Sequence, residues 1–204
     1  IPTDQDTVIV NHAAADHLDL VVPASTTAGV AFGGTVTIYD LYGNTVTDYT
    51  GTVHFDTTDP YAETVPGDYG FLLTDNGVKD FSGFKLYTEP SQTITTTGTA
   101  LTIPTDQDTV IVNHAAADHF AITGNGTQVA GTTNPITITA LDHWGNTDLN
   151  YTGDHDLIFA GASLAPDGTE PTVENKTPAP VDFGDTTTLT FASGQVTTDM
   201  VLYK

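Results

Sequence analysis

Pairs of aspartates separated by one residue recur in this sequence and have the residue type that binds metal. Asp4 and Asp6 form one pair, and Asp106 and Asp108 form the other. Calcium takes about six to eight oxygen ligands, often from loops with alternating carboxylates. One more aspartate lies in each linker, so the predicted calcium ligands are Asp4, Asp6, Asp16, Asp106, Asp108 and Asp118. An EF-hand is excluded because its glycine and glutamate are absent. The alternative is a solvated acidic surface, which also suits high ionic strength.

The histidines and serines of the chain, and its lack of cysteine, give little support for catalysis. His12, Asp16 and His17 have the residue types of a zinc or nickel site, but no further ligands can be identified. The chain has no cysteine, which excludes disulfides, thiolate zinc sites and a cysteine nucleophile. No serine lies in a Gly-x-Ser-x-Gly elbow. We therefore expect a protein that is not an enzyme.

Three Asn-x-Thr sequences are acceptors for glycosylation in a host that has the machinery. They begin at Asn125, Asn150 and Asn175. Chance is the alternative explanation, because the chain is rich in both asparagine and threonine.

Composition limits the classes of protein to which the chain can belong. Its 204 residues include 26 acidic and 4 basic side chains, for a formal net charge of -22. Such a charge repels nucleic-acid phosphates and anionic lipid, so we expect neither nucleic-acid binding nor membrane insertion. Threonine contributes 40 residues, and helix-favouring residues are sparse. Threonine and the other β-branched and aromatic residues favour strands, which predicts an all-β chain.

A sequence repeat organises the chain. Residues 1–17 are identical to residues 103–119, an offset of 102. The Asp-x-x-Gly-Asn motif at Asp40 recurs at Asp142 with the same offset. A fixed period indicates an array of structural units, each of about one small domain here. The motif is typical of a turn, because Asp and Asn bond nearby backbone and Gly allows a positive φ. A calcium site is the alternative.

Short alternating stretches separated by turn residues predict seven strands in the first repeat. They cover residues 18–22, 35–41, 52–56, 69–73, 80–87, 92–97 and 109–113. Seven strands in about a hundred residues are typical of an immunoglobulin-like sandwich. The Cys…Trp…Cys core of antibody-type domains is absent.

Three motifs carry a resemblance to a known family. They are Asp-Leu-Tyr-Gly-Asn at 40–44, Tyr-Thr-Gly-Thr-Val-His-Phe at 49–55 and Asn-Gly-Val-Lys-Asp-Phe at 76–81. With the Ala-rich linker at 13–17, they resemble the immunoglobulin-like repeats of large bacterial and archaeal cell-surface proteins. The resemblance covers most of the chain and is weaker in the second repeat. It implies tandem immunoglobulin-like sandwiches in a non-catalytic, extracellular module.

The repeat also predicts domain boundaries. We expect domain 1 at 18–114 and domain 2 at 115–204, with residues 1–17 as a strand and linker that complete a neighbouring domain. The predicted assembly strand is Thr7, Val8, Ile9, Val10 and Asn11, because its twin at 109–113 is the last strand of domain 1. Alignment of residues 202–203 with 86–87 predicts that domain 2 lacks two strands at its C-terminus. One donated strand would fill only one of these two places.

These features predict a structural module of an extracellular filament or cell-surface stalk. Its partners are copies of itself or adjacent repeats of one polypeptide, joined head to tail by strand complementation or within a longer chain. One alternative is an adhesin that binds carbohydrate or a host surface. Another is an accessory domain of a secreted polysaccharide-degrading enzyme. No cofactor is expected other than calcium.

Overall fold

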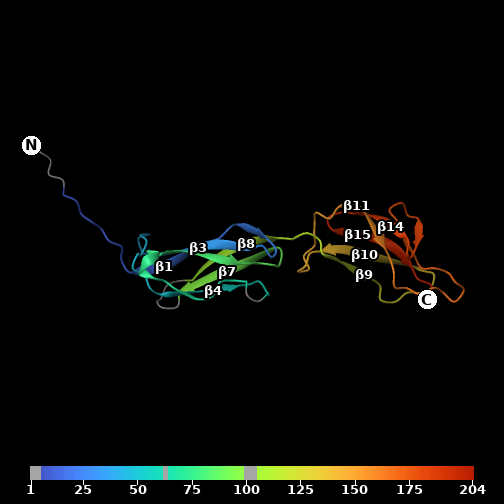
Figure 1. The fold of residues 1–204 in the computed structure, drawn as a ribbon, viewed down its shortest axis with the longest axis horizontal. Helices are drawn as coiled ribbons and strands as arrows, with labels where there is room; N and C mark the ends of the chain where they lie inside the picture. The colour runs from blue at the N-terminus through green and yellow to red at the C-terminus, as the bar shows by residue number, and fades with distance from the viewer. Residues whose placement is uncertain (1–5, 62–63, 99–104) are drawn as a thin grey trace, which may run out of the picture. The chain divides into compact units, whose positions relative to one another are not determined.

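The protein consists of two β-rich units (Figure 1). The computed structural model describes the whole chain except residues 1–5, 62–63 and 99–104. Unit 1 is Ile1–Asn113 and unit 2 is His114–Lys204. In the described residues the only helical element is the short 3-10 turn η1 (Leu73–Asp75), so the all-β prediction is confirmed.

The first sheet of unit 1 has three strands in the order β1-β3-β6. These are β1 (Ala15–Val21), β3 (Phe32–Asp40) and β6 (Val78–Phe84). All pairs are antiparallel. In β3 the residues Gly34, Val36, Ile38 and Asp40 are buried in alternation, which is the period of two that a half-buried strand requires.

The second sheet of unit 1 has five strands in the order β2-β8-β7-β4-β5. They are β2 (Ser25–Thr27), β8 (Asp106–Asn113), β7 (Ser91–Gly98), β4 (Thr52–Thr57) and β5 (Tyr69–Gly70). The β2–β8 pair is parallel, and the others are antiparallel. Two sheets of this order form an immunoglobulin-like sandwich, which confirms the predicted fold class.

The core of unit 1 lies between its two sheets. Phe84 and Phe55 pack edge to face with ring centroids 5.3 Å apart, and both are buried. Val110 and Val112 of β8 add the inward-facing aliphatic side chains of the last strand. Burying an aliphatic side chain contributes about 1.5–3 kcal/mol, so each strand is held mainly by its inward face.

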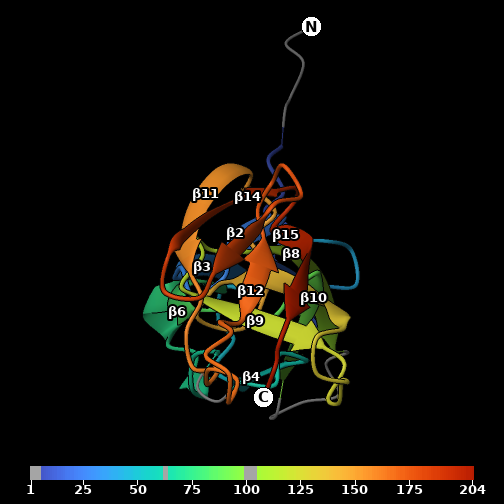
Figure 2. The same cartoon turned by 90° about the vertical axis from the view of Figure 1, so that its right-hand side faces the viewer.

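Unit 2 has a sheet of five strands and a separate pair. The sheet has the order β13-β12-β15-β10-β9 and the pair is β11-β14. Figure 2 labels all of these strands except β13. The strands are β9 (His119–Gly124), β10 (Thr133–Leu141), β11 (Gly153–Ile158), β12 (Thr172–Glu174), β13 (Pro180–Asp182), β14 (Thr186–Phe191) and β15 (Gln195–Val201). Ser193 and Gly194 join β14 to β15 with positive φ, as a tight hairpin turn requires.

The two units share their first three long strands but differ after them. In unit 1, β4 pairs with β7 and β5, and β7 pairs in turn with β8. Within the described part of unit 2, β11 pairs with β14 alone. The core of unit 2 contains Ile136, Ile138, Phe159, Val173, Leu189 and Phe191.

The structure corrects several predicted strands. Residues 7–11 form no strand in the single chain, because no neighbouring strand pairs with them there. The strand predicted at 69–73 reduces to β5, and η1 follows it. The strand predicted at 80–87 is β6, which begins and ends earlier. Sequence periodicity did not reveal β2, because three residues are too few to show a pattern.

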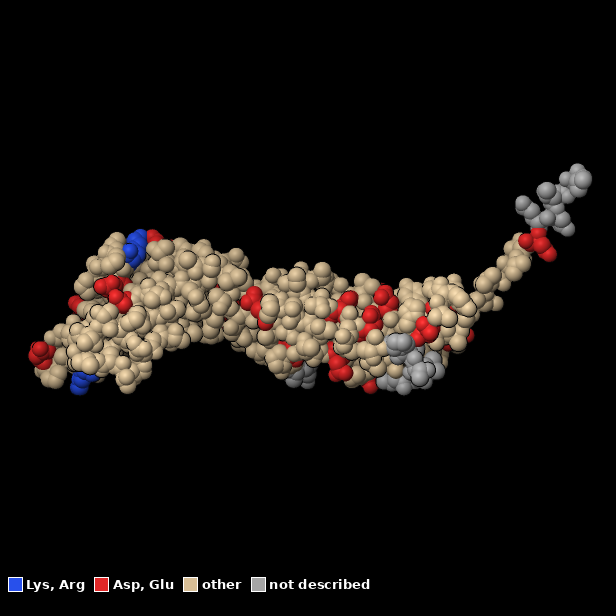
Figure 3. All heavy atoms as spheres, turned by 180° about the vertical axis from the view of Figure 1, so that it is seen from behind, with Lys and Arg blue, Asp and Glu red and all other residues tan. Residues whose placement is uncertain are grey.

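Acidic side chains are distributed over the face shown in Figure 3, whereas lysine atoms occur only at isolated points. Among the described residues, no helix has the length and apolar character needed to cross a membrane.

Candidate assembly sites

A buried aspartate holds the first linker against unit 1. Asp40 ends β3 and is fully buried. Its Oδ1 accepts hydrogen bonds from the backbone N–H groups of Tyr42 at 2.9 Å and Asn44 at 2.8 Å, which close the turn. Its Oδ2 accepts from the Asn44 side chain at 3.0 Å and from the Ala13 N–H at 2.8 Å. Gly43 supplies the positive φ of the turn. The motif is therefore both a turn and an anchor for the linker.

The same arrangement holds the second linker against unit 2. Asp142 accepts from the N–H of Trp144 at 2.9 Å, from the Asn146 side chain at 2.8 Å and from the N–H of Ala115 at 3.0 Å. Because β8 ends at Asn113, only one residue separates that strand from the anchored Ala115.

A further aspartate strengthens the second anchor. Asp148 Oδ2 accepts from the N–H of Ala117 at 2.8 Å, and its Oδ1 lies 3.2 Å from Nδ1 of His114. The corresponding pair in unit 1, His12 and Asp48, is longer at 3.6 Å.

The electrostatics of both anchors favour the ionised carboxylate. Burial by itself raises the pKa of the Asp40 carboxyl, but hydrogen bonds from Ala13 and Asn44 hold that pKa well below its ordinary value. The pKa of Asp142 is lowered in the same way, with burial opposed by hydrogen bonds that include the one from Ala115.

We expect the anchors to make unfolding sensitive to acid. A carboxylate whose pKa is lowered on folding adds stability above its ordinary pKa of about 4 and loses it as pH falls further. The melting temperature should therefore change little from pH 7 to about pH 4 through these two groups and then fall. Thermal melts across this range should show a smaller acid-induced fall in melting temperature in the double variant Asp40→Asn, Asp142→Asn. An equal acid-induced fall in melting temperature in the parent and the double variant would contradict this prediction.

Two of the predicted calcium ligands, Asp106 and Asp108, accept backbone hydrogen bonds in the structure. Asp106 Oδ2 accepts from the N–H of Leu20 at 2.8 Å, and Asp108 Oδ2 accepts from the N–H of Val22 at 3.2 Å. These contacts join β8 to the β1 side of the sandwich. Asp6 is exposed, and Asp4 lies outside the described residues.

The linker aspartates and histidines make only local pairs. Asp16 contacts His17 at 3.1 Å, and Asp118 lies 3.4 Å from His119 and 3.8 Å from His143. Among the described residues, no group of three or more His, Cys, Asp or Glu side chains is placed to hold a metal ion.

Calcium binding stays a prediction. A chelator at fixed ionic strength is expected to lower the melting temperature, because a ligand of the folded state stabilises it by mass action. The measurement is a thermal melt with and without chelator. An unchanged melt would leave the aspartates as solvated surface and hydrogen-bond acceptors.

The three glycosylation candidates lie in unit 2. Asn125 and Asn150 are exposed. Asn175 is half-buried, and its Oδ1 accepts from the backbone N–H and the hydroxyl of Thr177 at 2.9 and 2.8 Å. Modification at these residues stays a prediction.

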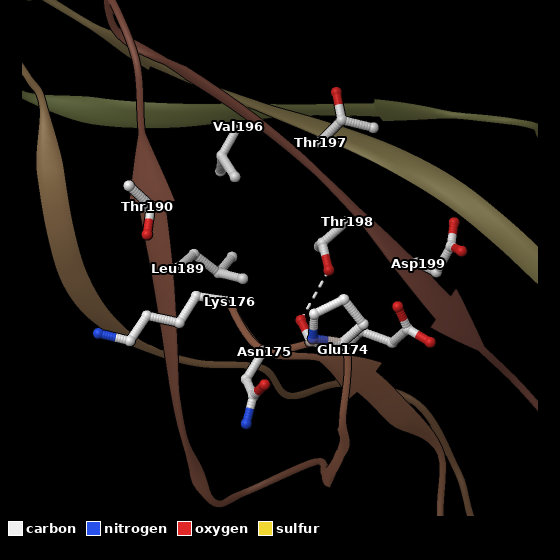
Figure 4. Close-up of a pocket in the computed structure, with 10 residues that line it drawn as sticks. Glu174, Asn175, Lys176, Leu189, Thr190, Val196, Thr197, Thr198 and Asp199 are labelled. Carbon is white, nitrogen blue, oxygen red and sulfur yellow. Dashed lines mark hydrogen bonds between the residues drawn. The ribbon is translucent and has the colours of Figure 1, made fainter.

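Asn175 also lines a polar hollow between β12, β14 and β15 (Figure 4). The hollow has a volume of about 330 Å³. Thr198 donates its hydroxyl to the Glu174 carbonyl at 2.6 Å, and Lys176 pairs with Asp154. These groups are engaged with one another, and they do not form a nucleophile and base arrangement.

Identical sequences differ in burial at the two ends of unit 1. Val8, Ile9 and Val10 are 80%, 82% and 84% exposed. Their twins Val110 and Val112 are 0% and 2% exposed in β8, with Ile111 on the outer face. The predicted assembly strand is thus an apolar segment that the single chain leaves uncovered.

Unit 2 leaves a corresponding apolar side uncovered. Phe120 and Ile122 of β9 are 40% and 58% exposed, whereas their twins Leu18 and Leu20 are buried at 3% and 2%. The two exposed side chains line a hollow of about 450 Å³ that also reaches Ile138, Leu157, Ile158, Phe159 and Ala160. In unit 1, β8 lies against β1 at this position.

Sequence reasoning missed the anchoring role of Asp40 and Asp142. The sequence contained one indication of this role. Each aspartate lies 27 residues after the alanine from whose N–H it accepts a hydrogen bond. The exposed side of β9 had no comparable signal, because its residues are as apolar as those of β1.

Comparison with known proteins identifies structural neighbours but no sequence relative. No family model matches the chain, and no curated protein matches it. A solved structure of FdeC, a broadly conserved Escherichia coli adhesin, is 18% identical with a TM-score of 0.44, and the match covers 93% of this chain and 57% of the chain in that structure. The Yersinia pseudotuberculosis adhesin InvE is 17% identical with a TM-score of 0.42, covering 90% and 51%.

A third similar structure is the surface-layer protein SbsC, domains 1–6. It is 18% identical with a TM-score of 0.33, and the match covers 92% of this chain and 22% of that one. The chain spans little more than half the length of the two adhesin structures.

Proposed function

We propose that this chain is a structural, non-catalytic module of a cell-surface stalk or extracellular filament, in which immunoglobulin-like units are joined head to tail. The observation that carries the proposal is the recurrence of one anchor at both linkers. Asp40 binds the N–H of Ala13, and Asp142 binds the N–H of Ala115. A linker tied by its backbone to the following unit loses freedom to bend, which suits a load-bearing array.

The joining of units follows from the repeat. The same strand and linker sequence precedes the first β-strand of each unit, so successive units can be added with the same joint. The units are joined either within a longer repeat polypeptide or by strand complementation between chains. Both routes put an apolar strand such as residues 7–11 into a neighbouring sandwich and remove it from water.

Electron microscopy of the native source material tests this function. Antibodies raised against the chain should label beaded filaments or stalks outside the cell. Labelling confined to the cell interior, or to isolated particles that bind glycan, would overturn the proposal.

A further inference from the structure

Residues 127–129 of unit 2 are the counterpart of β2, but they form no strand in this chain. In unit 1, β2 is held by its parallel pairing with β8. In unit 2, Val129 is 72% exposed. The side-chain Oε1 of the neighbouring Gln128 is buried and, among the described residues, accepts no hydrogen bond. The backbone edge that receives β8 in unit 1 is therefore open in unit 2.

The open edge follows the uncovered apolar side of β9 closely in the chain, because only Asn125 and Gly126 separate residues 127–129 from that strand. In unit 1 the corresponding surfaces of β1 and β2 are both covered by β8. Val110 and Val112 provide the buried side chains, and Asn113 bonds the Thr26 carbonyl through its side chain at 3.1 Å. One strand of this sequence thus satisfies both surfaces at once.

The chain contains a second copy of that strand. Residues 6–11 are identical to residues 108–113, and all are exposed in the single chain. We propose that residues 6–11 of a second copy of this chain lie in parallel beside residues 127–129 of unit 2, in the place that β8 takes beside β2. This rests on the proposed head-to-tail function and names its contact.

The pairing in unit 1 fixes the register. Ser25, Thr26 and Thr27 lie beside Ile111, Val112 and Asn113. At an offset of 102, the same register places Ile9 beside Thr127, Val10 beside Gln128 and Asn11 beside Val129.

The backbone hydrogen bonds follow from the same register. In unit 1 the N–H of Ile111 donates to the Ala24 carbonyl at 3.0 Å, and the N–H of Ala28 donates to the Asn113 carbonyl at 2.8 Å. In the complex, the N–H of Ile9 donates to the Gly126 carbonyl, and the N–H of Ala130 donates to the Asn11 carbonyl.

Side-chain alternation places Val8 and Val10 against Phe120 and Ile122. Ile9 faces outward, as its twin Ile111 does. The donor segment and the acceptor edge are different surfaces of one chain. The contact is therefore heterologous, and it propagates into an open array instead of closing a dimer.

Engineered cysteines test the pairing directly, because the chain has none of its own. A size-tagged copy with Ile9→Cys is mixed with a copy carrying Thr127→Cys under mild oxidation. The mixed-size disulfide product is expected at several times the yield obtained when Val30→Cys replaces Thr127→Cys. Val30 is 54% exposed in unit 1, so the control measures chance collision. Ser25→Cys with Ile111→Cys in one chain reports whether this register can form a disulfide.

A variant of the donor segment distinguishes specific docking from nonspecific association. Adding Val10→Asp to the Ile9→Cys copy should reduce the mixed product to the Val30 background, because Val10 faces the acceptor. Adding Val30→Asp instead should leave the yield unchanged, because Val30 is exposed in unit 1 and lies outside the donor segment. A Thr127 yield no higher than the Val30 yield, with the Ser25–Ile111 disulfide formed, would overturn the proposal.

Three further outcomes also decide between these possibilities. A disulfide formed within single chains of the double variant Ile9→Cys, Thr127→Cys at high dilution would overturn pairing between copies. Loss of the cross-link with beaded filaments still present on native material would refute this contact alone. A specific cross-link without any surface filament would refute the proposed function instead.

Discussion

Val110→Asp is expected to unfold unit 1, whereas Val8→Asp leaves its stability within about 0.5 kcal/mol of the parent. The two valines have identical neighbours in sequence, but Val110 is fully buried and Val8 is exposed. An unpaired charge in an apolar core costs several kcal/mol, which is comparable with the whole stability of a small domain, about 5–15 kcal/mol. Denaturant unfolding followed by the single tryptophan reports unit 2, so circular dichroism should follow unit 1.

The twin substitution is the matched control in this experiment. It introduces the same charge in the same local sequence, so a difference between the variants reflects burial alone. Equal losses in the two variants would mean that residues 7–11 are packed in solution within the same chain. That result would contradict both the exposure of the segment and its role as a donor strand.

Asp142→Ala is expected to destabilise unit 2 by several kcal/mol. The substitution leaves the N–H groups of Ala115, Trp144 and Asn146 without their carboxylate acceptor. A buried group that loses its hydrogen-bond partner costs about 1–3 kcal/mol. The measurement is the denaturation midpoint of unit 2 followed by tryptophan fluorescence, because Trp144 lies in the affected turn.

Asp118→Ala provides the control for this substitution. It removes the same charge from an exposed linker residue of the same unit, where an ion pair with His119 contributes little. Its expected change is within about 0.5 kcal/mol. Comparable losses in the two variants would show that the net charge of unit 2, and not the linker anchor, governs its stability.

The strands and the repeat could be predicted from sequence because both are local or exactly periodic. In β3 and β7, buried residues alternate with mostly half-buried ones, and turn residues bound the strands. The offset of 102 appears directly in the sequence. The predicted strand at 80–87 was displaced because Lys85, Leu86 and Tyr87 continue the alternation without pairing in the sheet.

The roles of the aspartates could not be predicted in this way. The spacing of Asp106 and Asp108 predicts calcium ligands, and that stays a prediction. It does not indicate that these carboxylates accept hydrogen bonds from the N–H groups of Leu20 and Val22, 86 residues away. Asp40 and Ala13 are likewise distant in sequence. Sequence spacing reports which carboxylates are near one another, whereas the fold decides which backbone donors face them.

The sequence by itself determined the all-β class, the sandwich and the joint that recurs with the repeat. It also determined the apolar alternation of residues 7–11, which is the same as that of residues 109–113. Only the tertiary structure decided which strands pair with β8 and which of its side chains are buried. The physical reason is that a strand's hydrogen bonds and apolar cover come from its neighbours. Strands β2 and β7 supply them to residues 109–113, and the single chain supplies none to residues 7–11 among its described residues.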